Sequence, residues 1–339
     1  MNPKPRVLIT GGAGFVGSHT ARALLDRGCE VFILDFFHQY IFPLAPSFLG
    51  NMQYRFDVLN KGAEVIRGNM NNKEDLRRKL LKIQPDRIIH LAALPLANVA
   101  RWQTEEAFES TLAATFNLLD VLGDAGSVKR LVYVSSSMVY GDFEKTPMPA
   151  EGRKDPKNIY GGMKLAGEVL VRIFSRHHNI PFVIVRPSAV YGPTDNNRRV
   201  LQIFIESALA GEVIEVADPE RTLLDFTYVS DAAQGLALAA LKDEALGETF
   251  NITYGSGRSL ADAVRILEGI LGKLKVKVQL GEDKFKPSRG SLDVSKARRL
   301  LGYAPAYPLE KGLAEYVAFV RGGKTPAKTG SDPGRKRKS

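Results

Sequence analysis

Residues 7–17 read V-L-I-T-G-G-A-G-F-V-G, and this stretch decides the fold. An apolar run predicts a buried strand, three glycines follow, and a helical apolar periodicity begins at Phe15. Gly11 allows a tight turn, Gly14 lets a pyrophosphate approach the helix N-terminus, and Gly17 lets the helix pack against the strand. The stretch predicts a dinucleotide-binding turn, and the alternative is an ordinary glycine-rich turn between two buried elements.

A second apolar run, residues 31–34, ends at Asp35, which lies 18 positions after Gly17. A carboxylate at the end of this second strand can accept hydrogen bonds from a ribose 2′-hydroxyl, and it would repel a 2′-phosphate. The sequence therefore predicts that the cofactor is NAD rather than NADP.

The bulk properties fit a globular protein of a reducing compartment. The 339 residues are 44% hydrophobic, which suffices for a large core and about two domains. Cys29 is the single cysteine and excludes an internal disulfide framework. The first strand begins so early that we expect no signal peptide, and no apolar run reaches the roughly 18 residues of a membrane span. We expect a cytoplasmic protein.

The formal net charge of +10 raises the question of a nucleic-acid partner. Seven basic residues and one acidic residue lie in residues 321–339, which are rich in Gly, Pro, Ser and Thr. We interpret this stretch as a disordered, solubilising basic tail. The alternative is a weak contact with an anionic surface, and nucleic acid is an unlikely partner.

The first 186 residues alternate between strand and helix patterns, which predicts a doubly wound parallel sheet of Rossmann type, an α/β fold. The expected strands are Arg6–Thr10, Glu30–Leu34, Ala63–Arg67, Arg87–Leu91, Arg130–Ser135 and Phe182–Arg186. The expected helices are Phe15–Arg27, Lys73–Lys82, Glu105–Asp124 and Ile159–His178. Ligands of such sheets bind at the carboxyl ends of the strands. We assign residues 1–186 to an NAD-binding Rossmann domain.

The alternation breaks down after residue 186, and residues 187–320 are expected to form a smaller C-terminal α/β substrate-binding part, with some segments returning to the main sheet. The expected helices are Val200–Ala210, Ser230–Leu241, Ser259–Leu271 and Leu309–Val320, and the expected strands are Thr249–Ile252 and Val276–Leu280. Residues 36–62 contain seven aromatic residues and no clear periodicity, so we expect irregular structure there, either as a partner surface or packed over the protein itself.

Three polar residues carry the predicted chemistry. Ser136 follows the fifth strand, and Tyr160 and Lys164 share one helical face because they are spaced i, i+4. A nearby ammonium and the positive nicotinamide of NAD⁺ both favour the phenolate of Tyr160. Tyr160 can then take a proton from a sugar hydroxyl, Ser136 can hold the same oxygen, and Lys164 can hold the nicotinamide ribose. The alternative is a surface Tyr–Lys pair of an ordinary helix.

From these motifs the chain resembles the extended short-chain dehydrogenase/reductase family, in its nucleotide-sugar epimerase/dehydratase branch. The resemblance covers about residues 5–320. It is carried by T-G-G-A-G-F-V-G (10–17), H-L-A-A (90–93), V-S-S-S-M-V-Y-G (134–141), Y-G-G-M-K (160–164), R-P-S-A-V-Y-G-P (186–193), D-F-T-Y-V-S-D-A-A (225–233) and S-K-A-R-R-L-L-G-Y-A-P (295–305).

The resemblance implies a set of site residues. The implied catalytic residues are Ser136, Tyr160 and Lys164. The implied NAD-binding residues are Gly11, Gly14, Phe15, Val16, Gly17, Asp35, Asn69, Met70, Leu91, Ala92, Ala93, Tyr160, Lys164 and Pro187. The implied substrate-binding residues are Ser136, Ser137, Ala189, Arg221 and Arg289, and no metal site is expected.

Some positions depart from the family pattern. The 4,6-dehydratases carry Asp and Glu where this chain has Ser137 and Met138, and decarboxylating relatives also carry Glu at the second position. Neither residue can supply the acid that those reactions need, so a dehydratase or decarboxylase is not expected. Asn69 replaces an aspartate that contacts adenine, and its carbonyl oxygen can still accept that bond.

The residues expected to contact the diphosphate also depart from the family pattern. The usual R-D-F reads L-D-F at 224–226, so the arginine that binds diphosphate is replaced by leucine. Arg221 either substitutes for it or is a surface charge. Arg289, in P-S-R, matches a family diphosphate-binding arginine.

The resemblance implies an NAD-dependent nucleotide-sugar epimerase that acts at C4 through a 4-keto intermediate. An NAD-linked 4-keto-sugar reductase is the alternative enzyme, and a non-catalytic dinucleotide-sensing or nucleic-acid-binding relative is the alternative of another class. The expected partners are a nucleotide-diphosphate sugar and a second copy of the chain, since relatives pair through the helices at Glu105–Asp124 and Ile159–His178.

Overall fold

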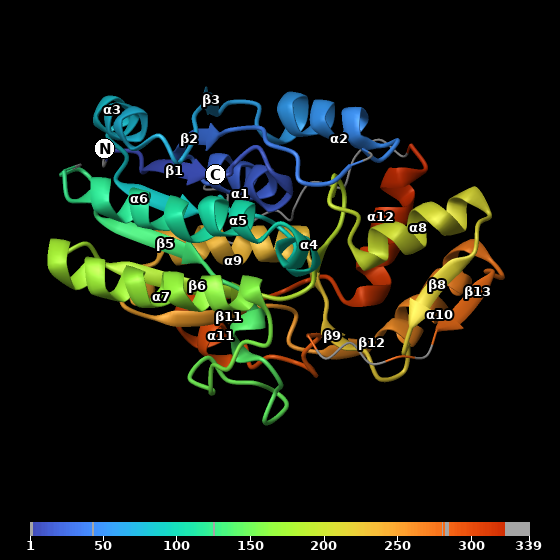
Figure 1. Cartoon of the computed structure of the whole chain (residues 1–339). Helices are drawn as coiled ribbons and strands as arrows, with labels where there is room; N and C mark the ends of the chain where they lie inside the picture. The colour runs from blue at the N-terminus through green and yellow to red at the C-terminus, as the bar shows by residue number, and fades with distance from the viewer. Residues whose placement is uncertain (1–2, 43, 125, 280, 282–284, 323–339) are drawn as a thin grey trace, which may run out of the picture.

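The strand that precedes the glycine turn lies inside a seven-stranded parallel sheet (Figure 1). The structure is a computed structural model and describes residues 3–42, 44–124, 126–279, 281 and 285–322. The strands follow the order β3-β2-β1-β4-β5-β6-β11. Their bounds are β1 Arg6–Thr10, β2 Glu30–Asp35, β3 Glu64–Arg67, β4 Arg87–His90, β5 Arg130–Val134, β6 Phe182–Pro187 and β11 Thr249–Ile252. The predicted Rossmann-type sheet is confirmed.

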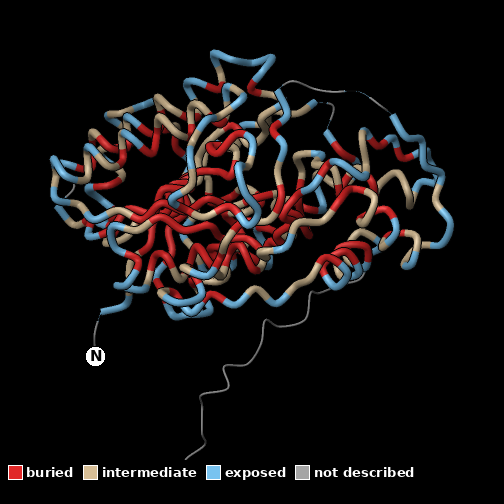
Figure 2. The backbone as a smooth tube through the Cα atoms, turned by 90° about the horizontal axis from the view of Figure 1, so that it is seen from below, coloured by how far each residue is buried: buried red, intermediate tan, exposed pale blue. Residues whose placement is uncertain are grey.

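Helices cover both faces of the sheet. Successive side chains of a strand point to opposite faces, and in these strands the side chains on both faces are mainly apolar. One face packs against α1 (Phe15–Leu25), α9 (Val229–Leu241) and α11 (Ser295–Leu301). The other face packs against α3 (Lys73–Ile83), α6 (Ala114–Leu122) and α7 (Ile159–His178). Figure 2 shows that the buried backbone is concentrated in the sheet between these layers.

The residues after β6 build a second region and also complete the main sheet. A smaller core of their own joins α8 (Val200–Ala210), α10 (Leu260–Leu271) and α12 (Leu309–Val320). Four short strands pair at this end of the molecule: β8 Ile214–Ala217 with β13 Val276–Gln279, and β9 Leu223–Asp225 with β12 Gly257–Ser259. β7 (Val190–Tyr191) pairs with β10 (Thr227–Tyr228). Figure 1 shows this lobe beyond the carboxyl ends of the main strands.

Two predicted segments differ from the structure. Residues 36–62, expected to be irregular, contain α2 (Phe48–Tyr54), which continues into a π-helical turn at Arg55–Leu59. Gly50 and Asn51 are weak helix formers, and this helix is held by tertiary contacts of Asn51 and Arg55 that local periodicity does not reveal. The single helix expected over Glu105–Asp124 consists of α5 (Thr104–Ala107), a π-helical turn (Phe108–Ala113) and α6.

A short helix, α4 (Ala97–Trp102), precedes α5. Within the part of the chain that the structure describes, no helix is long and apolar enough to cross a membrane. The basic stretch 321–339 lies outside the described residues from position 323 onward.

Candidate active site

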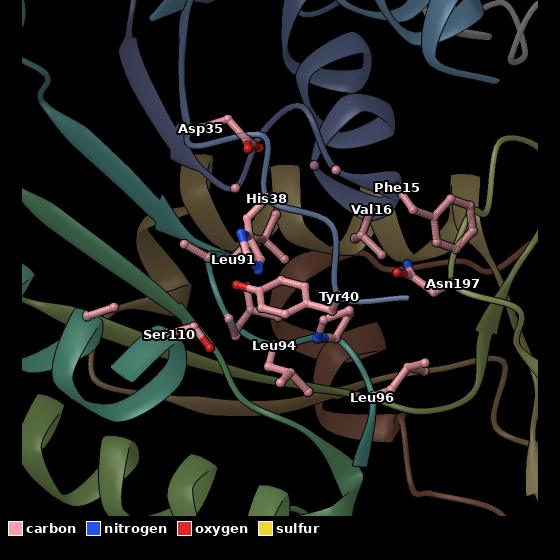
Figure 3. Close-up of a pocket in the computed structure, with 18 of the residues that line it drawn as sticks. Phe15, Val16, Asp35, His38, Tyr40, Leu91, Leu94, Leu96, Ser110 and Asn197 are labelled. Carbon is pink, nitrogen blue, oxygen red and sulfur yellow. The ribbon is translucent and has the colours of Figure 1, made fainter. Parts of the chain in front are cut away.

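A cavity of about 560 Å³ opens at the carboxyl ends of the central strands. This size falls within the range of sites for small molecules and cofactors. Its lining comes from the loops after β1, β2, β3, β4, β5 and β6 together with residues from the C-terminal region. Figure 3 shows Asp35 and Asn197 in different parts of this lining, with Tyr40 near the centre of that view. The cavity therefore lies where a doubly wound sheet binds its ligands.

The glycine turn has the backbone geometry that the sequence predicts. Gly11 has a φ of +69°, and a Cβ added there would come within 2.8 Å of the backbone nitrogen of Ala92. A Cβ at Gly17 would collide with the backbone of Gly11 and Gly12. A Cβ at Gly14 would meet only the Gly11 carbonyl oxygen, at 3.1 Å, so its other side faces the cavity. These positions fit a dinucleotide whose pyrophosphate lies against the N-terminus of α1.

Asp35 stands at the end of β2 and lines the cavity. Its Oδ2 accepts a hydrogen bond from the Ala13 backbone nitrogen at 3.0 Å, and its Oδ1 accepts one from the Phe37 backbone nitrogen at 2.8 Å. Burial raises the pKa of this carboxyl, while the backbone hydrogen bonds oppose that rise. The two amides fix the carboxylate beside the glycine turn, where a ribose hydroxyl can reach it.

Ser136, Tyr160 and Lys164 converge on one wall of the cavity. Tyr160 lies in the first turn of α7, which begins after Asn158, whose side chain accepts a hydrogen bond from the Gly161 nitrogen at 2.9 Å. The Lys164 Nζ lies 5.9 Å from the centroid of the Tyr160 ring and donates to the Val134 carbonyl oxygen at 2.9 Å. Ser136 hydrogen bonds with Tyr160.

Burial shifts the pKa values of Lys164 and Tyr160 in opposite directions. Burial lowers the pKa of Lys164 to about 8, so its ammonium persists at neutral pH. Burial also raises the pKa of Tyr160, while the charge of Arg199 and the hydrogen bond from Ser136 lower it. Arg199 is therefore a second cation within the protein, besides the predicted Lys164, that favours the phenolate. A positive nicotinamide in the cavity would add to this effect.

A buried ion pair lies directly behind the three polar residues. Glu168, one helical turn after Lys164, accepts hydrogen bonds from the Arg186 Nε at 2.7 Å and the Arg186 Nη2 at 2.6 Å. The Ser135 hydroxyl donates to the same carboxylate at 2.6 Å. Arg186 is 1% exposed and Glu168 is 3% exposed. This network ties the ends of β5 and β6 to α7, and so fixes the spacing of the reactive groups.

The structure brings together all but one of the predicted site residues. The cavity is lined by Gly11, Gly14, Phe15, Val16, Gly17, Asp35, Asn69, Met70, Leu91, Ala92, Ala93, Ser136, Ser137, Tyr160, Lys164, Pro187, Ala189 and Arg289. Arg221 is exposed and is not among the lining residues. The Asn69 Oδ1, expected to accept from adenine, already accepts a hydrogen bond from the Asn71 nitrogen at 2.9 Å.

Arg289 is the lining residue best suited to an anion. Burial alone lowers its pKa to about 10, and its buried Nε has no hydrogen-bond partner in the structure. A guanidinium that lines a cavity and has a buried Nε without a partner favours an anionic ligand such as a phosphate.

Several lining residues were missed by the motif analysis, namely His38, Tyr40, Arg55, Asn196, Asn197 and Arg199. The run D-N-N-R-R at 195–199 begins two positions after the Y-G-P motif (191–193), so its position was an available signal. Arg55 offered no such signal, because it lies in a segment without periodicity.

The chain is similar to a family of known proteins and to several solved structures. Residues 7–253 match the model of the NAD dependent epimerase/dehydratase family. UDP-glucuronate 4-epimerase 4 of Arabidopsis thaliana is 30% identical over 335 residues, which cover 92% of this chain and 74% of that protein. The crystal structure of UDP-glucuronic acid 4-epimerase from Bacillus cereus, in complex with UDP-glucuronic acid and NAD, superposes with a TM-score of 0.84 at 27% identity, covering 93% of this chain and 99% of the other.

A dTDP-glucose 4,6-dehydratase, DesIV of Streptomyces venezuelae with NAD and TYD bound, superposes almost equally well. Its TM-score is 0.83 at 26% identity, covering 94% of this chain and 98% of the other. The backbone therefore does not separate epimerases from dehydratases, and the side chains at the reaction centre must do so.

Proposed function

This chain belongs to the NAD dependent epimerase/dehydratase family, and from that premise we propose that it is an NAD-dependent nucleotide-sugar 4-epimerase acting on a UDP-sugar. The observation that carries the proposal is the convergence of Ser136, Tyr160 and Lys164 on one cavity wall, where Ser137 and Met138 follow in place of an acidic pair. Elimination of water needs a proton donor at these two positions, whereas oxidation and reduction at one carbon does not.

We assign one part of the cavity lining to the cofactor and the other part to the nucleotide sugar. The glycine turn, Asp35, Lys164 and Pro187 would hold NAD, which supplies a hydride acceptor and donor when bound. The remainder is lined by Ser137, Ala189, Asn196, Asn197, Arg199 and Arg289, and we assign these residues to the nucleotide sugar. Arg289 would bind the diphosphate. We place the substrate-binding part at residues 187–320 on this basis.

Tyr160 would accept the proton of the sugar C4 hydroxyl as the carbon–hydrogen bond at C4 breaks. Ser136 would hold the same oxygen by a hydrogen bond, both in the alcohol and in the 4-keto sugar. Tyr160 would return the proton to the C4 oxygen as the carbon–hydrogen bond at C4 re-forms on the opposite face of the turned sugar. No net oxidation results, so the reaction consumes no external reductant.

The cofactor preference is tested at Asp35. We expect the wild-type protein to bind NAD about tenfold or more tightly than NADP, because a 2′-phosphate would meet the half-buried carboxylate of Asp35. Asp35→Asn keeps the size of the side chain and removes its charge, so the preference should shrink. The measurement is calorimetric titration of both variants with both cofactors. Equal affinities for NAD and NADP in the wild-type protein would refute the assignment.

We also propose that the protein is a cytoplasmic homodimer. Exposed apolar side chains lie on the paired helices, with Phe108 and Phe116 on the π-helical turn and α6, and Val169 and Ile173 on α7. Their exposed fractions are 44–50%, which is unusual for four apolar residues on adjacent elements. A second copy of the same surface could cover them.

The dimer is tested with Phe116→Lys/Ile173→Lys and light scattering after size-exclusion chromatography. The wild-type protein should have the mass of two chains and the double variant the mass of one. Val278→Lys, on β13 away from these helices, is the matched control and should remain dimeric. A wild-type mass of one chain would exclude the dimer.

A further inference from the structure

Arg55 joins the cofactor turn to the segment that lines the substrate side of the cavity. Its Nη1 donates a hydrogen bond to the Ala13 carbonyl oxygen at 3.2 Å, and its Nη2 donates one to the Thr194 carbonyl oxygen. The side chain is 4% exposed and itself lines the cavity. One guanidinium therefore bridges two backbone segments that are 181 positions apart in the chain.

The first of these segments is the glycine turn. Ala13 lies between Gly11 and Gly14, and its backbone nitrogen donates to Asp35 while its carbonyl accepts from Arg55. Burial lowers the pKa of Arg55 to about 10, although the carboxylates of Asp195 and Asp35 favour the charged guanidinium. A positive charge thus lies against the turn on which the pyrophosphate of a dinucleotide would rest.

The second segment, residues 193–199, supplies Asn196, Asn197 and Arg199 to the cavity lining. Thr194 is fully buried and has a φ of +71°, a left-handed conformation that needs support in a threonine. The carbonyl oxygen that Arg55 holds belongs to this residue. Arg55, together with His19 of α1, which contacts Pro193 and Thr194, therefore supports this backbone geometry from the cofactor side.

Asn51 holds the same segment through its side-chain amide. Its Nδ2 donates to the Asp195 carbonyl oxygen at 3.3 Å and to the Asn196 Oδ1 at 2.8 Å. Asn51 thus provides a natural comparison with Arg55, since both residues anchor residues 193–199 and the hydrogen bonds of Arg55 also extend to Ala13.

We propose that Arg55 is a positioning residue that couples the binding of NAD to the binding of the nucleotide sugar. The inference rests on the proposed function. A dinucleotide on the glycine turn fixes Ala13 and attracts the guanidinium, and the guanidinium then holds Thr194 and the residues after it in the conformation that meets the sugar nucleotide. The coupling must be reciprocal, so the nucleotide should also tighten the binding of NAD.

The test measures the dissociation constant of UDP by calorimetry, with NAD-loaded and NAD-depleted protein, for the wild-type protein and two variants. In the wild-type protein we expect UDP to bind at least about fivefold more tightly when NAD is present, which is the lower range of allosteric coupling. Arg55→Met keeps the apolar stem and removes both donors, and the ratio should fall toward one. Asn51→Ala should weaken UDP binding in both states and leave the ratio close to that of the wild-type protein.

Arg55→Lys keeps the buried charge and serves if Arg55→Met does not fold. A compact ammonium does not reproduce the fork of the guanidinium, so this variant should also lose most of the coupling. A wild-type ratio that persists in the Arg55 variants would overturn the inference and leave the proposed function intact. Failure of UDP to bind the NAD-loaded wild-type protein would contradict the proposed function and, with it, the inference.

Discussion

Tyr160→Phe is expected to lower turnover by about 10²-fold or more, while the protein keeps its fold and its bound NAD. The change removes one oxygen atom, and the ring can remain packed with Leu94, Ala100 and Ala107, which it contacts in a small apolar cluster. The loss should therefore reflect the missing proton acceptor. The measurement is the rate of sugar epimerisation, together with the amount of NAD retained per chain.

Ser136→Ala is the comparison for this prediction. It removes the hydrogen bond to the sugar oxygen and to Tyr160 but leaves the base in place, so its loss should be smaller than that of Tyr160→Phe. Ser136 also accepts a hydrogen bond from the Met138 nitrogen at 3.2 Å, so the thermal stability of both variants should be checked. Normal turnover by Tyr160→Phe would show that another group takes the proton.

Glu168→Gln is expected to lower the free energy of unfolding by about 3–5 kcal/mol, because it leaves the Arg186 charge buried without its counter-ion. Both side chains are almost fully buried, and Arg186 also donates to the Tyr140 hydroxyl and to the Ala150 carbonyl oxygen. Chemical denaturation of NAD-loaded protein measures the change.

Glu215→Gln is the matched control, because it breaks an exposed ion pair with Lys277, whose charged atoms lie 3.1 Å apart. Pairs of this kind contribute about 1 kcal/mol or less. Similar effects of the two substitutions would mean that the buried pair does not anchor the site.

The main sheet could be predicted because its signals are local. The apolar strand, the glycine turn and the amphipathic helix of residues 6–25 are adjacent in sequence, and β1 and α1 begin at the predicted residues. The same holds for α7, which spans Ile159–His178 as predicted, because Asn158 provides a helix cap and a long apolar face follows.

The parts that escaped prediction depend on contacts between distant residues. α2 forms although its sequence has little helical preference, since Asn51 and Arg55 bury polar groups against residues 193–196. The influence of Arg199 on Tyr160 also requires knowledge of how the segment after β7 folds back over the cavity. Motifs predicted the groups to which we assign the chemistry, but they did not predict the groups that hold those residues in place.

The most direct test of the account is incubation with UDP-glucuronate, UDP-glucose and related UDP-sugars in deuterated water, followed by mass spectrometry and NMR. We expect a product that is a C4 isomer of its substrate, has unchanged mass and carries no solvent deuterium on carbon, because the hydride leaves C4 and returns to it without exchange. This reaction should need no added NADH. A product lighter by one water or by carbon dioxide, deuterium on a carbon beside C4, or a stoichiometric requirement for NADH would contradict the proposed 4-epimerase.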